Sequence, residues 1–251
     1  MRKTMIEYST HESTVLGTSI GRLMIDRQFD EWDVIKEEIS KSNYEYLRIK
    51  VQNPLNHELD RLNSLCKTAH LLEIVRSYTT YDLNNMPLED WSGDFNFVQV
   101  DATTRELFFD TFKETYEDIP FGSYTPEAVF KRFDLETQRT CLSSYFYNFY
   151  TGNYPEKAAY LIYHHEQELV GCLSIDFFET ESYSYYVGVK KAFRKNNILL
   201  KSINFIHRTT QSRKLMYAKG SARLHNLYSQ KAFDKSGMLC TGYDWIYLLE
   251  L

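Results

Sequence analysis

The sequence predicts a mixed α/β fold in two domains. Strand and helix patterns alternate on both sides of one turn-rich stretch, which indicates two separate α/β regions. In the second region, three successive strand patterns lie between residues 158 and 189 and are joined by short polar turns. We therefore expect a mixed, mostly antiparallel sheet flanked by helices, preceded by a small N-terminal α/β domain.

The composition is that of a globular protein and excludes several classes. The chain has 251 residues, of which 43% are hydrophobic and 25% charged, with a formal net charge of −5. Its apolar runs are far shorter than the ~20 residues that span a bilayer, and no apolar signal segment follows the N-terminus. We expect a cytoplasmic protein with no membrane partner. A pI near 5.8 argues against a nucleic-acid partner, because phosphate contacts require a basic face.

The four cysteines give no sign of a metal site. They lie far apart, with no neighbouring Cys or His at the spacing of metal ligands. We therefore expect reduced thiols and no metal.

The first domain is predicted over residues 1–85 and is followed by a linker over residues 86–96. The boundary region contains Asn84, Pro87 and Gly93, which favour turns. No internal repeat is visible in the sequence. The elements expected before the boundary are a strand over 20–25, a helix over 30–42, a strand over 44–51, a helix over 58–66, and one or two strands over 69–83.

The second domain is predicted over residues 97–251. Thr125 and Pro126 mark a helix start, because threonine caps helix N-termini and proline suits the first helical position. A capping box is expected where the helix over 103–116 begins. The full set of expected elements is a strand over 97–101, helices over 103–116 and 125–152, strands over 158–165, 169–178 and 183–189, a helix over 195–209, a strand over 215–219, a helix over 227–236, and a last strand pair over 239–249.

Residues 186–199 have the pattern of a strand followed by a basic loop and then by the N-terminus of a helix. Such a terminus favours bound phosphate, because its N–H groups lack helical partners and its dipole is positive. Arg194 and Lys195 are then a phosphate-facing pair, although a solvated basic helix start would have the same pattern.

Residues 226–238 form a second motif, a helix entered through Asn226 and left through Gly237. Asn226 is either an N-cap residue or a hydrogen-bond partner of a cofactor, and the two roles are compatible. Gly237 stands where a helix C-cap is expected.

Together the two motifs resemble the acetyl-CoA-binding half of the GNAT superfamily of N-acetyltransferases. Val189, Phe193 and Arg194 match the strand-loop-helix pattern of that family. The second motif matches at Asn226, Ser229, Phe233, Lys235, Gly237 and Met238. This resemblance covers about residues 97–251. Residues 1–85 are similar, in length and position, to the small N-terminal domain of TDP-fucosamine acetyltransferase.

The resemblance implies transfer of an acetyl group from acetyl-CoA to a primary amine, with an amino-sugar nucleotide as the favoured acceptor. Backbone N–H groups would polarise the thioester carbonyl, the basic loop would hold the pyrophosphate, and strands 183–189 and 215–219 would part around a groove. The residues assigned to acetyl-CoA are Val187, Gly188, Val189, Arg194, Lys195, Asn196, Asn197, Ile198, Leu199, Asn226 and Phe233.

The catalytic candidates are Tyr228, Glu179 and Glu181. Phe233 occupies the position of a proton-donating tyrosine in many relatives, and Tyr228 is the nearest hydroxyl, rotated about 140° around the helix. Glu179 and Glu181 are candidate general bases, or else surface charges.

Asn197 and Leu199 replace glycines of the family loop. Asparagine tolerates a positive φ, whereas Leu199 adds bulk where close approach is wanted. The alternative function is therefore a GNAT-like binding or scaffold protein that has lost catalysis. A homodimer is left open.

Overall fold

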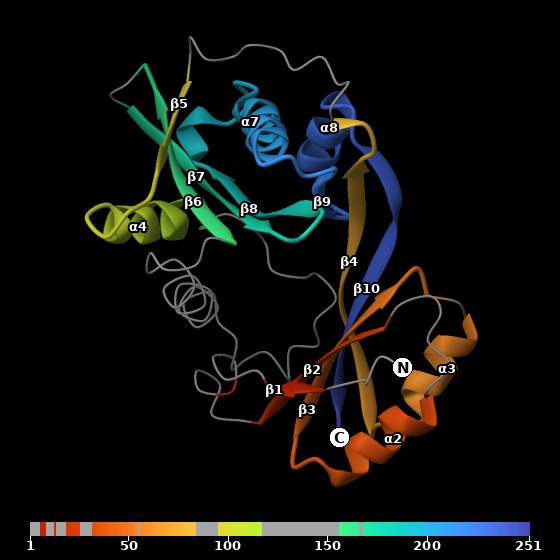
Figure 1. Cartoon of the computed structure of the whole chain (residues 1–251). Coiled ribbons are helices and arrows are strands. Elements are labelled where there is room, and N and C mark those ends of the chain that lie inside the picture. Colours follow the sequence, from red (N-terminus) through yellow and green to blue (C-terminus); the bar gives the residue numbers. More distant parts are fainter. Residues whose placement is uncertain are drawn as a thin grey trace. The chain divides into compact units, whose positions relative to one another are not determined.

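Figure 1 shows the computed structural model, which describes residues 6–8, 13, 19–25, 32–54, 56–83, 95–116, 156–165 and 168–251. The chain forms two compact units. Unit 1 combines Met1–Val75, Pro120–Cys141 and Gly242–Leu251, and unit 2 combines Arg76–Ile119 and Leu142–Thr241. Strands β4 (Thr68–Thr80) and β10 (Leu239–Glu250) each belong partly to both units.

Unit 1 is a small α/β structure with the strand order β1-β2-β3-β10. Strand β2 is parallel to β3, and β10 is antiparallel to β3. Alternation along β3 buries Leu47, Ile49 and Val51, and α2 contributes Trp32 and Ile35 to the same cluster. The remaining bounds are β1 (Glu7–Tyr8), β2 (Ile20–Ile25), α2 (Trp32–Lys41), β3 (Tyr46–Gln52) and α3 (Asn56–Asn63).

Unit 2 contains a mostly antiparallel sheet with the strand order β9-β8-β7-β6-β5. Strands β5 to β8 pair antiparallel, and β9 is parallel to β8. Their bounds are β5 (Phe95–Gln99), β6 (Lys157–His164), β7 (Glu168–Phe177), β8 (Glu181–Val189) and β9 (Tyr217–Arg223). The fold class predicted from the sequence is confirmed.

Helices cover both faces of the unit 2 sheet (Figure 1). Tyr160 and Ile162 of β6 pack in one cluster with Ile198 and Ile206 of α7, whereas Leu161, between them in sequence, packs with α4 in another. This alternation places α7 and α4 on opposite faces. The bounds are α4 (Arg105–Tyr116), the 3₁₀ helix η2 (Lys191–Phe193), α7 (Ile198–Ser212) and α8 (Leu227–Lys235).

The two units share one order of elements, which the sequence does not reveal as a repeat. In unit 1, parallel strands β2 and β3 are joined through α2, and α3 then leads into β4. In unit 2, parallel strands β8 and β9 are joined through α7, and α8 then leads into β10. The structure therefore shows a repeated order of elements, whereas no repeat is visible in the sequence.

One predicted element needs correction. Residues 239–250 form one strand, not a strand pair, whereas residues 68–80 form one strand, which is one of the two predicted alternatives. Gly242 has a φ of 151°, and a Cβ there would lie 2.1 Å from Asn53 Oδ1. Asn53 Oδ1 also accepts a hydrogen bond from the Tyr243 N–H at 2.7 Å. Gly242 is therefore required by a close cross-strand approach rather than by a turn.

The start of α4 also differs from the predicted capping box. Asp101 Oδ1 accepts hydrogen bonds from the backbone N–H groups of Thr103 and Thr104 at 2.8 and 3.0 Å. Hydrogen bonds from the Thr103 hydroxyl and others from this turn lower the pKa of Asp101 to about 2. Asp101 therefore fixes the turn that precedes α4, an arrangement that sequence reasoning did not weigh.

The domain boundaries near residues 86–96 stay a prediction, because residues 84–94 lie outside the described ranges. The borders between the compact units lie inside β4 and β10, since residues 244–250 pair with β3 in unit 1. The predicted helix over 125–152 also lies outside the described residues.

Candidate functional site

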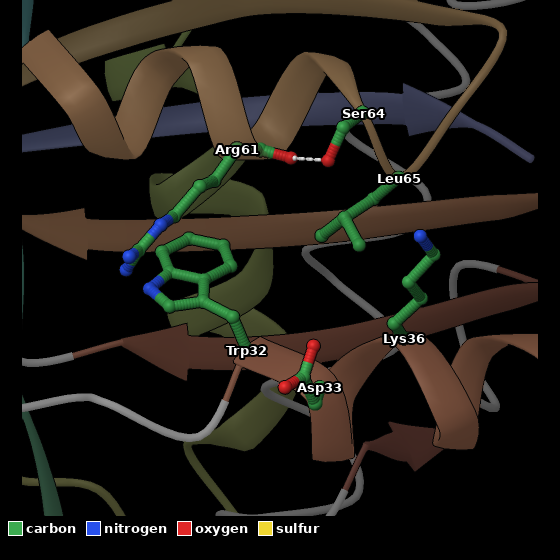
Figure 2. Close-up of a pocket in the computed structure, with 6 residues that line it drawn as sticks. All are labelled: Trp32, Asp33, Lys36, Arg61, Ser64 and Leu65. Atoms are coloured by element: carbon green, nitrogen blue, oxygen red, sulfur yellow. Dashed lines mark hydrogen bonds between the residues drawn. The ribbon is translucent and has the colours of Figure 1, made fainter.

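One described pocket lies in unit 1, and its lining contains none of the site residues predicted from the sequence (Figure 2). It is a depression of about 210 Å³ lined by Trp32, Asp33, Lys36, Arg61, Ser64 and Leu65. Its polar groups serve local structure: the Arg61 guanidinium lies over the Trp32 ring at 5.8 Å, and the Ser64 hydroxyl donates to the Arg61 carbonyl at 2.7 Å. The site residues predicted from the sequence all lie in unit 2.

Strand β8 contains a bulge at the centre of the unit 2 sheet. Ser174 of β7 stands opposite Tyr186, whereas the next residue, Ile175, stands opposite Ser184. Tyr185 is therefore the extra residue of the bulge. Bulges bend a strand and redirect its backbone groups, and they are common beside active sites.

Strands β8 and β9 part immediately beside this bulge. Their pairing runs from Glu181 with Tyr217 to Ser184 with Gly220 and ends there. From Tyr185 onward, β8 pairs with β7 but not with β9. The two strands therefore part, as predicted, after the pair of Ser184 with Gly220, and the predicted groove between them stays a prediction.

Two backbone N–H groups of β8 point into the fork. The Lys190 N–H donates to the Val170 carbonyl of β7 at 2.9 Å. Hydrogen-bonded and non-hydrogen-bonded positions alternate in an antiparallel pair, so the N–H groups of Val187 and Val189 point away from β7. Val187 and Val189 are two of the three β8 residues that the sequence analysis assigns to acetyl-CoA.

Gly188, the third of these residues, serves the packing of α4. A Cβ at Gly188 would lie 2.4 Å from Thr115 Oγ1 and 2.5 Å from Tyr186 Oη. These two hydroxyls are hydrogen-bonded to each other at 2.9 Å. The absence of a side chain at Gly188 therefore leaves room for this hydrogen bond between α4 and β8.

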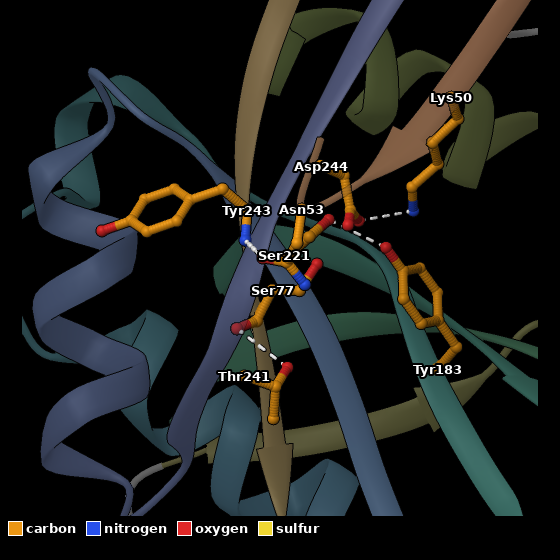
Figure 3. Close-up of polar contacts among 8 residues, drawn as sticks. All are labelled: Lys50, Asn53, Ser77, Tyr183, Ser221, Thr241, Tyr243 and Asp244. Carbon is orange, nitrogen blue, oxygen red and sulfur yellow. Dashed lines mark hydrogen bonds and ion pairs between the residues drawn. The ribbon is translucent and has the colours of Figure 1, made fainter. Parts of the chain in front are cut away.

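A pair of hydroxyls joins β8 to β9 at the fork (Figure 3). Tyr183 Oη and Ser221 Oγ lie 2.8 Å apart. Tyr183 lies one residue before the last pair of the two strands, and Ser221 lies one residue after it. Sequence reasoning missed both residues, because only the strand register shows that they meet.

An ion pair and a hydrogen bond join the basic loop after β8 to α4. Lys190 Nζ lies 2.8 Å from Glu114 Oε2, and Arg194 donates from Nε to the Val189 carbonyl at 3.1 Å and from a terminal nitrogen to the Thr115 carbonyl at 3.3 Å. Arg194 thus holds the loop against its own strand and α4. Lys195 and Asn196 are exposed beside it.

The loop enters α7 through left-handed backbone. Lys195 has a φ of 78° and Asn197, the N-cap residue, has a φ of 57°. Asn197 therefore preserves the path that a glycine would take, as predicted. The turn ends at Ile198, which is buried, so α7 begins three residues later than predicted. The N–H groups of the first turn of α7 have no partner within the helix.

Leu199 does not block the loop in the way predicted from the sequence. Its side chain packs against a core cluster that includes Ile203, Ala222 and Phe233. Only its backbone belongs to the first turn of α7. Its side chain is part of the packing between α7, α8 and β9.

Helix α8 supplies a cap and an apolar ring rather than a catalytic hydroxyl. Asn226 Oδ1 accepts from the Ser229 N–H at 3.1 Å, which confirms the N-cap role. Phe233 is 4% exposed and stacks on Tyr78 with ring centroids 4.8 Å apart. Its ring tip lies 2.9 Å from the place of a Cβ on Gly220, at the fork. Tyr228 is 75% exposed on the first turn.

The two predicted carboxylates lie before the fork. Glu179 is exposed in the turn between β7 and β8. Glu181 forms an ion pair with Lys219 at 2.5 Å and precedes the bulge by four residues, or about 13 Å of strand. Asp176 is buried and ion-paired with Lys157 at 2.8 Å.

Burial shifts two further groups in unit 2. Desolvation raises the pKa of the Cys172 thiol to about 12, so this cysteine stays protonated. Desolvation lowers the pKa of His207 to about 4, so its ring is neutral near pH 7. His207 Nε2 lies 3.2 Å from Thr80 Oγ1. Both groups belong to the core.

Solved structures match the fold of the chain, whereas no protein-family model and no curated protein match it. A functionally unknown conserved protein from Staphylococcus epidermidis is similar over 93% of this chain and 84% of its own, with a TM-score of 0.61 and 13% identity. A GCN5-related N-acetyltransferase from Kribbella flavida is similar over 92% of this chain and 81% of its own, with a TM-score of 0.55 and 10% identity.

A GCN5-related N-acetyltransferase from Sphaerobacter thermophilus is similar over 87% of this chain and 64% of its own, with a TM-score of 0.55 and 11% identity. The chain therefore has the fold of the GNAT acetyltransferases. No helix in the described ranges is long and apolar enough to cross a membrane. The same ranges contain no group of three or more His, Cys, Asp and Glu that could hold a metal ion.

Proposed function

We propose that the chain is an N-acetyltransferase that moves an acetyl group from acetyl-CoA to a primary amine. The observation that carries this proposal is the fork between β8 and β9. There a bulge at Tyr185, inward-pointing N–H groups of β8 and the first turn of α7 follow one another along the chain. The GNAT fold supports the same reaction class.

In this proposal the phosphates of acetyl-CoA bind at the start of α7. The N–H groups of Ile198, Leu199 and Leu200 and the helix dipole favour an anion there. Lys195, exposed at this turn, adds a cation. Arg194 acts indirectly, because its guanidinium donates to the Val189 and Thr115 carbonyls and so fixes the loop.

The acetyl end occupies the fork. A thioester carbonyl accepts hydrogen bonds from the N–H groups of Val187 and Val189, which stabilise negative charge as the amine attacks. Holding both substrates side by side supplies much of the rate enhancement. The acceptor is a small amine, and the likeness of residues 1–85 to an N-terminal domain of an amino-sugar nucleotide acetyltransferase favours that class.

A second candidate function is binding without catalysis. Phe233 has no proton to give, and Tyr228 is exposed on another side of α8. A GNAT-like binding protein would keep acetyl-CoA affinity and lack acetyl transfer.

Calorimetric titration of the full chain with acetyl-CoA tests the proposal. Lys195→Ala should weaken binding about twofold to fivefold, because it removes one exposed cation near the phosphates. Lys214→Ala is the matched control, since Lys214 is exposed, has a φ of 58° and follows the other end of α7. No acetyl-CoA binding at millimolar concentration, or equal losses in the two variants, would contradict the proposed site.

A further inference from the structure

We infer that Tyr183 and Ser221 together supply the proton to the sulfur of CoA as the acetyl group leaves. This inference rests on the proposed function and deepens it. It assigns a general acid to two strands of the sheet in a chain whose α8 carries phenylalanine at the position of the family's tyrosine.

The two hydroxyls lie where β8 and β9 part. Lys219 stands opposite Tyr183 and Gly220 opposite Ser184, so Ser221 stands level with Tyr185, the bulge residue. Tyr183 therefore leans toward the fork to reach Ser221 Oγ at 2.8 Å. The hydroxyl pair marks the closed end of the fork, as Figure 3 shows for the two side chains.

The distance along β8 from the hydroxyl pair to Val187 is short. Val187 lies two residues beyond Tyr185, or about 7 Å along β8. A thioester whose carbonyl oxygen accepts from the Val187 N–H has its sulfur within one bond of the carbonyl carbon. If the sulfur lies on the side of the carbonyl carbon nearer to the Ser184–Gly220 pair, it faces the Tyr183 and Ser221 hydroxyls.

Helix α8 does not offer the donor. Phe233 points its ring tip at Gly220 from the face of the sheet opposite to the Tyr183 and Ser221 side chains, and it carries no hydroxyl. Tyr228 is 75% exposed, and the Ser184 side chain is buried on the face that carries α7. Among the described residues of β8 and β9, Tyr183 and Ser221 are the hydroxyls that bond across the fork.

The proposed step needs no reactant beyond acetyl-CoA, the amine and solvent. The amine nitrogen bonds to the carbonyl carbon, the C–S bond breaks, and its electron pair stays on sulfur. Tyr183 gives its proton to the sulfur while Ser221 donates a hydrogen bond to the phenolate oxygen that forms. The proton lost by the amine passes to solvent, and solvent returns one to Tyr183.

The test compares the binding of CoA and desulfo-CoA to the full chain at pH 9, where much of the thiol is ionised. A hydrogen bond to a charged sulfur should make the wild type prefer CoA by about tenfold. Tyr183→Phe and Ser221→Ala should each reduce this preference toward equality while the affinity for desulfo-CoA stays unchanged. A role in structure alone would weaken both ligands equally.

Tyr217→Phe is the matched control, because Tyr217 lies on the same face of β9 at the opposite end of its pairing with β8. It should keep the full preference. If the wild type binds neither ligand, the proposed function fails and this inference falls with it. If it binds both and Tyr183→Phe keeps the wild-type preference, only this inference is overturned. The inference is also overturned if the wild type binds both ligands equally.

Discussion

Gly188→Ala should destabilise unit 2 by about 2–4 kcal/mol. The new methyl group would stand 2.4 Å from Thr115 Oγ1 and 2.5 Å from Tyr186 Oη, so both groups must move about 1 Å. That movement breaks their hydrogen bond, which contributes about 0.5–1.5 kcal/mol. Overpacking at a buried position costs a further 1–3 kcal/mol or so.

Urea unfolding of the full chain, followed by circular dichroism, measures this loss. Thr115→Ala is the control, because it removes the same hydrogen bond without the steric clash and should cost clearly less than Gly188→Ala. A stability within about 0.5 kcal/mol of the wild type for Gly188→Ala would refute the packing account. It would return Gly188 to the role predicted from the sequence, contact with acetyl-CoA.

Three further predictions concern α7 and α8. Leu199→Gly should lower stability by about 2–3 kcal/mol in urea unfolding and should not tighten acetyl-CoA, because it removes a side chain packed against the Phe233 cluster; tighter binding would contradict this. His207 has a folded pKa of about 4 against about 6.5 unfolded, so the unfolded state binds more protons between these values and stability falls as the pH drops from 6.5 to 4, by about 3 kcal/mol. His207→Gln should flatten that part of the pH–stability curve, and an unchanged slope would show that other groups cause it. Asn226→Ala should cost about 1 kcal/mol through loss of the α8 cap, and a loss below a few tenths in urea unfolding would count against the cap.

Much of the unit 2 architecture follows from the sequence, because its signals are local. Alternating apolar residues predict β6, β7 and β8, and Asn226 and Gly237 bracket α8 by capping chemistry. The left-handed backbone at Asn197 is likewise a property of one residue and its neighbours.

The features that decide the site depend on register, which one sequence does not display. The run from Tyr183 to Val189 gives no sign that Tyr185 is a bulge residue, since the bulge exists only relative to β7. The contact between Tyr183 and Ser221 likewise depends on the pairing of β8 with β9. The direction of the Leu199 side chain depends on the core between α7, α8 and β9, which the sequence alone does not display.

In the proposed function, acetyl-CoA occupies the fork and the first turn of α7. Amide hydrogen exchange of the full chain, with and without saturating acetyl-CoA, tests this placement. We expect slower exchange in two segments, residues 185–189 and 196–200, with α2 of unit 1 unchanged. Bound acetyl-CoA that leaves both segments unprotected, or that protects residues 32–41 instead, would contradict it.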